Sequence, residues 1–131
     1  MGSGSSSSVK PNFKNGKPTM DGNFTPMYGG QVYRISDIKN SRWGFYNDSD
    51  NLYFHVAVLF DYDCQITPLG NATAFRIDDP DDGDEDDYGK YLVEVDLAPG
   101  ATEEFVEGVI TGWKMDTLEG RTNKDERTYR L

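Results

Sequence analysis

Residues 52–60 restrict the fold more than any other stretch, because apolar side chains alternate on both faces of an extended chain. One face carries Leu52, Phe54, Val56, Val58 and Phe60, and the other carries Tyr53, His55, Ala57 and Leu59. A strand that is apolar on both faces is typical of the centre of a sandwich or barrel, where each face contacts other parts of the fold. Residues 91–97 alternate in the same way and predict a second core strand.

The rest of the chain also favours strands. Period-2 patterns predict strands over 32–36, 42–47 and 73–77, and residues 105–115 look β-like but contain Gly108 and Gly112, which indicates a bulge or two short strands. Residues 9–30 suggest coil and turns, and their aromatic side chains Phe13, Phe24 and Tyr28 suggest an arm pinned to the domain surface. Aromatic residues make up 13% of the chain, which argues against an acidic disordered protein.

These patterns predict one all-β domain, an antiparallel sandwich or barrel, with less than about a fifth of its residues in helix. We place this domain in residues 12–131, after a disordered tail in residues 1–11 that is rich in Ser and Gly. Turn residues at intervals along the chain agree with short antiparallel connections. The chain contains no stretch of 18 apolar residues, so no membrane-spanning helix is predicted.

Charge is unevenly distributed along the chain. The chain has 13 basic and 23 acidic residues, so its net charge is −10. A protein this acidic repels phosphate backbones, and nucleic acid is not an expected partner. The first twenty residues nevertheless contain Lys10, Lys14 and Lys17 and no acid. A basic N-terminal segment attached to an acidic domain suggests that this segment interacts with an anionic surface.

The first six residues, MGSGSS, fit the N-myristoylation pattern, with Gly2 as the acceptor. A Gly-Ser linker left by an expression vector would look the same. The downstream lysines favour the functional interpretation, because one acyl chain binds membranes only marginally and needs a second attractive contribution. We therefore predict that lipids of the inner membrane leaflet are the partner, with Gly2 lipidated and Lys10, Lys14 and Lys17 adding electrostatic attraction.

Eight of the ten residues in 78–87 are acidic, a density that suggests a calcium site. The spacing does not fit an EF-hand loop, because placing Gly83 at position six puts Pro80 and Gly89 at two ligand positions. We therefore favour a self-repelling surface loop without a bound metal. The alternative is an irregular Ca²⁺ site that uses Asp78, Asp79, Asp81, Asp82 and Asp84, as in a Ca²⁺-dependent phospholipid-binding module.

Catalysis is not expected, because the chain has a single histidine, His55, and a single cysteine, Cys64. A nucleophilic pair also needs a group that orients the imidazole. The neighbouring Asp61 and Asp63 disfavour a thiolate at Cys64. A small hydrolase built on these two residues remains the weakest alternative. We predict no enzyme activity and no cofactor, and the lone cysteine favours a reducing compartment.

Several strings resemble the small calpain-related proteins of kinetoplastid parasites. They are FKNGKP at 13–18, YRI at 33–35, WGFYND at 43–48, TE at 102–103 and FVEG at 105–108. The likeness covers roughly residues 12–115.

The resemblance implies a non-catalytic, calpain-related β domain at the cytoplasmic face of the plasma or flagellar membrane. We predict that it is a monomer and acts there as a scaffold or membrane-organising protein. It also implies myristate on Gly2 and palmitate on a nearby cysteine. Position 3 carries Ser3 instead of the cysteine that the second modification requires, so palmitoylation is not carried over to this chain.

Overall fold

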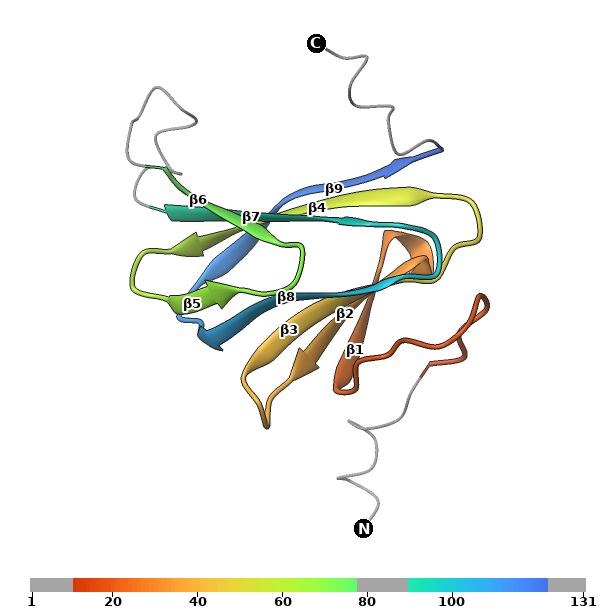
Figure 1. Ribbon diagram of the computed structural model, residues 1–131, viewed down its shortest axis with the longest axis horizontal. Helices are drawn as coiled ribbons and strands as arrows, with labels where there is room; N and C mark the ends of the chain where they lie inside the picture. The colour runs from red at the N-terminus through yellow and green to blue at the C-terminus, as the bar shows by residue number, and fades with distance from the viewer. Residues whose placement is uncertain (1–10, 78–89, 123–131) are drawn as a thin grey trace.

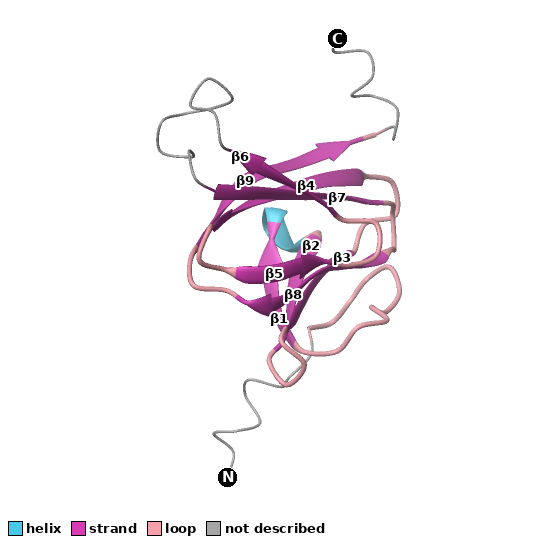
Figure 2. Ribbon diagram, turned by 60° about the vertical axis from the view of Figure 1, so that its left-hand side comes forward, coloured by secondary structure: helices cyan, strands magenta, loops and turns pink. Residues whose placement is uncertain are grey.

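Two antiparallel β-sheets pack face to face in the computed structural model (Figure 1). The structure describes residues 11–77 and 90–122. The tail expected to be disordered therefore lies almost wholly outside the described residues, as does the acidic run at 78–87. Figure 2 shows the two sheets as separate layers. The prediction of an all-β domain is confirmed, and of the two predicted architectures the structure is the sandwich.

The described part of the chain contains nine strands and one short 3₁₀ helix. The first sheet has the order β1 (Asn23–Met27), β2 (Val32–Asp37), β3 (Arg42–Asn47), β8 (Thr102–Val109) and β5 (Gln65–Pro68). The second has the order β6 (Thr73–Ile77), β7 (Lys90–Leu97), β4 (Tyr53–Asp61) and β9 (Trp113–Arg121). The 3₁₀ helix η2 (Tyr28–Gly30) joins β1 to β2.

Strand β4 lies inside the four-stranded sheet, as its two apolar faces predict. It pairs with β7 and β9, and Val56 is opposite Val95 while Val58 is opposite Val93. Phe54 and these four valines are buried, which confirms the predicted core. On the other face of β4, Ala57 and Leu59 are only 2% and 1% exposed. Both faces of this strand are therefore removed from water.

Aromatic rings join the two sheets across the core. The ring of Phe105 on β8 lies 5.0 Å from that of Phe45 on β3 and 6.2 Å from that of Phe60 on β4, between centroids. All three side chains are fully buried. Because large rings contribute much of the apolar area that a small sandwich buries, Phe105 links the sheets energetically as well as geometrically.

Two edge strands that the sequence pattern missed each contain proline. Residues 23–27, predicted as coil, form β1, and residues 65–68 form β5. Pro26 and Pro68 weaken the strand signal, yet each strand lies at an edge of the five-stranded sheet, where a missing backbone N–H need not interrupt a ladder. The strand prediction failed here because position in the sheet, which the local sequence does not record, decides whether proline is tolerated.

The segment predicted over 105–115 is two strands, one in each sheet. Gly108 ends the regular part of β8 with φ at +133°, and a side chain there would collide with the backbone oxygen of Gln65 on β5. Strand β9 continues to Arg121, well beyond the predicted end. A register shift opposite Ala57 and Val58 breaks the alternation of β9, which is why its second half was not predicted.

Replacing Phe105 with alanine should lower the free energy of unfolding by about 3–5 kcal/mol, because it opens a cavity where the two sheets meet. Phe75→Ala is the matched control, since this phenylalanine also lies on a strand but is 50% exposed. Urea unfolding of both variants measures the difference. Equal loss of stability in the two variants would contradict the packing described here.

Candidate functional site

An N-terminal arm, residues 11–22, covers the outer face of the five-stranded sheet. Phe13 sits in a box of three rings, at centroid distances of 5.4 Å from Phe24, 5.2 Å from Tyr33 and 5.2 Å from Tyr46, and each contact is edge-to-face. Edge-to-face pairs add to the stability that burial alone provides. The sequence-based expectation of a pinned arm is thus met at Phe13. The arm, red to orange in Figure 1, passes beside β1 and β2.

Asp48 fastens this arm with its carboxylate. The backbone N–H of Lys14 donates to both carboxylate oxygens, at 2.9 and 3.1 Å, and the backbone N–H of Asn15 donates to one of them at 2.7 Å. The side-chain amide of Asn15 donates to the backbone oxygen of Asp48 at 2.9 Å. Asp48 is 4% exposed. Hydrogen bonds to an ionised group are stronger than those between neutral groups, so this carboxylate is a strong anchor for the arm.

Asn47, the preceding residue, ties the end of β3 to the other sheet. Its side-chain amide nitrogen donates to the backbone oxygens of Leu52, Leu97 and Ala98 at 2.7, 3.1 and 3.0 Å. Its side-chain oxygen accepts from the backbone N–H of Ser49 at 3.1 Å. Successive residues of an extended chain point to opposite faces. Asn47 therefore connects β3 inward, while Asp48 holds the arm outside.

Met20 and Gly44 form the second contact between the arm and the sheet. A Cβ at position 44 would collide with the sulfur of Met20 and would lie 2.9 Å from the backbone oxygen of Glu103. Only glycine lets the arm and strand β8 approach β3 this closely. The strings at 13–18 and 43–48, together with Met20, thus contain the two halves of one contact surface. We call it the arm-docking site: Phe13, Asn15, Met20, Gly44, Tyr46 and Asp48.

Tyr46 belongs to both the aromatic box and the Asp48 contact. Its hydroxyl lies 3.4 Å from a carboxylate oxygen of Asp48. Burial raises the pKa of Tyr46, and the negative charge of Asp48 raises it further. The neutral hydroxyl is therefore the form that the docked arm favours.

The predicted membrane-facing lysines are only partly described. Lys14 and Lys17 are exposed on the arm, on either side of the turn at Gly16, whose φ is +113°. Lys10 and the predicted acylation site Gly2 lie outside the described residues. The structure thus brings Lys14 and Lys17 into one turn and gives no position for the other two.

The alternative calcium ligands Asp78, Asp79, Asp81, Asp82 and Asp84 also lie outside the described residues. Within residues 11–77 and 90–122, no group of three or more His, Cys, Asp or Glu side chains is placed to hold a metal ion. The same residues contain no helix long and apolar enough to cross a bilayer. Calcium binding by the acidic run stays an untested alternative.

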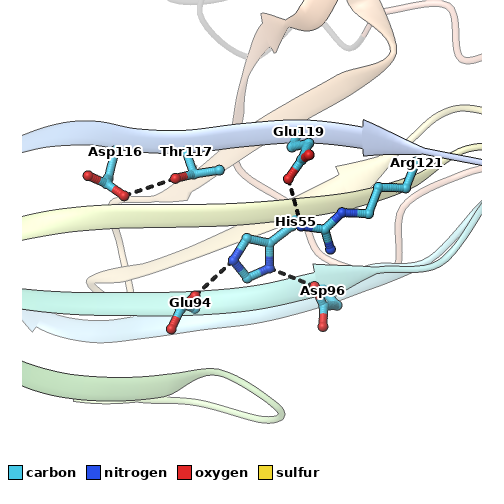
Figure 3. Close-up of polar contacts among 7 residues, drawn as sticks. All are labelled: His55, Glu94, Asp96, Asp116, Thr117, Glu119 and Arg121. Atoms are coloured by element: carbon cyan, nitrogen blue, oxygen red, sulfur yellow. Dashed lines mark hydrogen bonds and ion pairs between the residues drawn. The ribbon is translucent and has the colours of Figure 1, made fainter. Parts of the chain in front are cut away.

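His55 and Cys64 do not form a catalytic pair. His55 lies on the outer face of the four-stranded sheet, where its Nδ1 is 2.7 Å from Asp96 and its Nε2 is 2.8 Å from Glu94 (Figure 3). Cys64 is instead part of the core, and its sulfur accepts a hydrogen bond from the backbone N–H of Thr111 at 3.3 Å. Both imidazole nitrogens face carboxylates, so neither is directed at the thiol.

Strand β9 continues the charged cluster around His55. Glu119 is the cross-strand neighbour of His55, and it accepts a hydrogen bond from the guanidinium of Arg121 at 2.6 Å. Glu119 and Arg121 are two residues apart on β9, so their side chains point to the same face of the sheet as His55. The cluster gathers polar side chains from β4, β7 and β9, and the sequence pattern did not reveal it because these strands are not adjacent in the chain.

A β-sandwich whose outer face is covered by its own N-terminal arm is the class of domain that these observations define. The chain belongs to the family described as "Domain of unknown function (DUF1935)", whose model matches residues 13–121. No curated protein matches the chain.

Two solved structures from Leishmania major are similar to this protein. One, a hypothetical protein, is 56% identical with a TM-score of 0.77, and the match covers 89% of this chain and 97% of that one. The other is SMP-1, Small Myristoylated Protein, which is 29% identical with a TM-score of 0.74 and coverage of 99% and 96%. These matches confirm the resemblance to small kinetoplastid proteins that the sequence strings predicted.

Replacing Asp48 with alanine should release the arm and lower the free energy of unfolding by about 2–4 kcal/mol, because bonds to a charged acceptor and the packing of Phe13 are lost together. Asp50→Ala, at an exposed site two residues away, should leave stability nearly unchanged. Urea unfolding compares the two variants. An equal effect of both substitutions would show that the Asp48 contacts do not hold the arm.

Stability at alkaline pH should depend on Tyr46. Because the folded state raises the pKa of Tyr46, its contribution to stability is complete below about pH 10 and is lost as the pH rises toward the raised pKa. Tyr46→Phe should therefore make the loss of stability above about pH 10 less steep, whereas Tyr28→Phe at an exposed site should not. Urea midpoints measured across this pH range provide the comparison. Parallel pH curves for the wild type and Tyr46→Phe would contradict the prediction.

Proposed function

We propose that this protein is a non-catalytic, N-myristoylated β domain that associates with the cytoplasmic face of the plasma or flagellar membrane and serves there as a scaffold or membrane organiser. Its partner is the inner-leaflet lipid, and it acts as a monomer without nucleic acid or cofactor. The separation of His55 from Cys64 supports a non-catalytic role.

Two observations support the acyl chain. The MGSGSS start fits the myristoylation pattern at Gly2. The second observation is that a relative similar over 99% of this chain has the name Small Myristoylated Protein. Ser3 leaves this chain with one predicted acyl group, and a single myristoyl chain gives reversible binding, with an association constant on the order of 10⁴ per molar.

The docked arm is the observation that carries the proposal. Phe13 and Asp48 hold the chain against the sheet directly after the segment that bears Gly2. Eight residues lie between Gly2 and Pro11, and the nine residue-to-residue steps correspond to a maximum reach of about 30 Å. An acyl group at Gly2 would therefore keep the sandwich close to the leaflet.

The exposed lysines of the arm add to this attachment. Each basic residue near an anionic leaflet contributes about 1 kcal/mol at most. Lys14 and Lys17 lie together on the arm turn, so docking holds their charges near the base of the tail. Repulsion between the leaflet and the acidic body reduces the net gain, and salt screens both contributions.

Gly2→Ala should move the protein from the membrane fraction to the cytosol, because alanine does not accept myristate. Fractionation of cells that express the chain with its natural start measures this, together with the intact mass of the protein isolated from its own cell. An intact mass without an acyl group, or complete membrane retention of Gly2→Ala, would contradict the proposed tether.

Glutamine at Lys10, Lys14 and Lys17 should weaken binding to anionic vesicles and reduce its salt dependence. Arg76→Gln, at an exposed basic residue on β6 and outside the arm, serves as the matched control. Equal salt dependence of the triple variant and the control would show that the three lysines do not contribute to membrane binding.

A further inference from the structure

Apolar side chains gather where the turn between β2 and β3 meets the connection between β8 and β9. Ile38 in this turn is 73% exposed, and Trp113 at the start of β9 is 42% exposed. A shallow groove is lined in part by Ile38, Trp43 and Ile110, and the ring of Trp43 lies 4.9 Å from that of Trp113. Trp43 is itself buried in the core, and it links the groove to Trp113 and to Arg34, whose guanidinium lies over both tryptophan rings. We call this group of residues the Trp113 patch: Arg34, Ile38, Trp43, Ile110 and Trp113.

Arg34 gives this patch an unpaired positive charge. Its guanidinium carbon lies 4.6 Å from the ring centre of Trp43 and 5.1 Å from that of Trp113. Within the described part of the chain, no hydrogen bond or ion pair occupies the Arg34 guanidinium. Burial lowers the pKa of Arg34, but a guanidinium stays protonated in proteins, so this charge is partly removed from water. A half-buried cation without a carboxylate partner is unexpected in a protein whose net charge is −10.

The course of the arm relates this patch to the tail. Asn15 contacts Asp48 at the end of the sheet opposite the β2–β3 turn, and Phe13 contacts Tyr33 and Tyr46 nearer the middle. From Asn15 back to Phe13 the chain therefore runs toward the end that carries Ile38. That turn projects from the lower side of the domain in Figure 1.

We propose that the Trp113 patch docks onto a phospholipid leaflet, with Ile38 and Trp113 entering the interfacial region and Arg34 binding a lipid phosphate. This inference rests on the proposed membrane attachment and deepens it, because it states which surface of the sandwich faces the lipid. Tryptophan favours the boundary between headgroups and acyl chains, and guanidinium groups bind phosphate through paired N–H donors.

The charges around the patch indicate which lipids it binds. Arg42 in the same groove already lies 3.7 Å from Glu104 and 3.6 Å from Glu107, and Asp37 also lines the groove. The surroundings of Arg34 are therefore not basic, and anionic lipid gives no special advantage. Docking should occur on neutral phosphatidylcholine and should depend little on salt, in contrast to the attraction contributed by the arm lysines.

The test uses the full chain acylated at its N-terminus in vitro, so that it does not depend on whether cells acylate Gly2. Binding to phosphatidylcholine vesicles is measured by sedimentation, and vesicles with brominated acyl chains report tryptophan insertion by quenching. Trp113→Ala and Ile38→Ser together should reduce partitioning about tenfold, since both apolar side chains return to water. Phe75→Ala, at a similarly exposed aromatic residue on β6, the edge of the four-stranded sheet opposite β9, is the matched control and should bind like the wild type.

Ile38→Ser alone, in an exposed turn, keeps the test valid if the Trp113 variant unfolds, and it should reduce partitioning severalfold. Arg34→Gln should weaken binding to phosphatidylcholine without changing its salt dependence. The proposal would be overturned if the Ile38 and Trp113 variants partitioned like the wild type, or if brominated lipid did not quench tryptophan fluorescence. Either result would favour a protein as the partner of the patch. If the protein isolated from cells lacked myristate, by contrast, that result would contradict the proposed function but not the docking of the Trp113 patch on lipid.

Discussion

The buried carboxylate of Asp48 is the interaction on which the position of the arm depends. Burying a charge is unfavourable unless hydrogen bonds replace its water, and the backbone N–H groups of Lys14 and Asn15 provide them. If the arm left the sheet, Asp48 would lose these partners, and the box around Phe13 would open at the same time. Docking therefore combines an electrostatic requirement with apolar packing, and each contribution supports the other.

The same end of β3 also holds the sandwich together. Asn47 binds backbone oxygens that flank β4 and β7, while the adjacent Asp48 holds the arm on the opposite side. One turn thus couples the packing of the two sheets to the position of the N-terminal segment. In the proposed function, the docked arm fixes the point at which the acylated tail leaves the sandwich. The Trp113 patch then determines which surface of the sandwich faces the membrane.

The fold was largely predictable from local pattern, and the candidate site was not. Alternation on both faces of β4 identified the central strand, because its period follows directly from strand geometry. The edge strands β1 and β5 were missed because each contains proline, and a strand tolerates proline only when it lies at the edge of a sheet. The motif strings contained Phe13 and Asp48, but Asp48 bonds to amides 33 and 34 residues earlier. Contacts at that separation form only in the folded chain, so their roles could not be inferred from spacing.

Nuclear Overhauser contacts in the full chain in solution test the docked arm most directly. A docked arm should give cross-peaks from the ring protons of Phe13 to those of Tyr33 and Tyr46, and backbone relaxation of residues 13–20 that is as restrained as that of the strands. Sharp, random-coil resonances for Phe13 and fast backbone motion throughout these residues would contradict it, because the arm would then be free of the sheet.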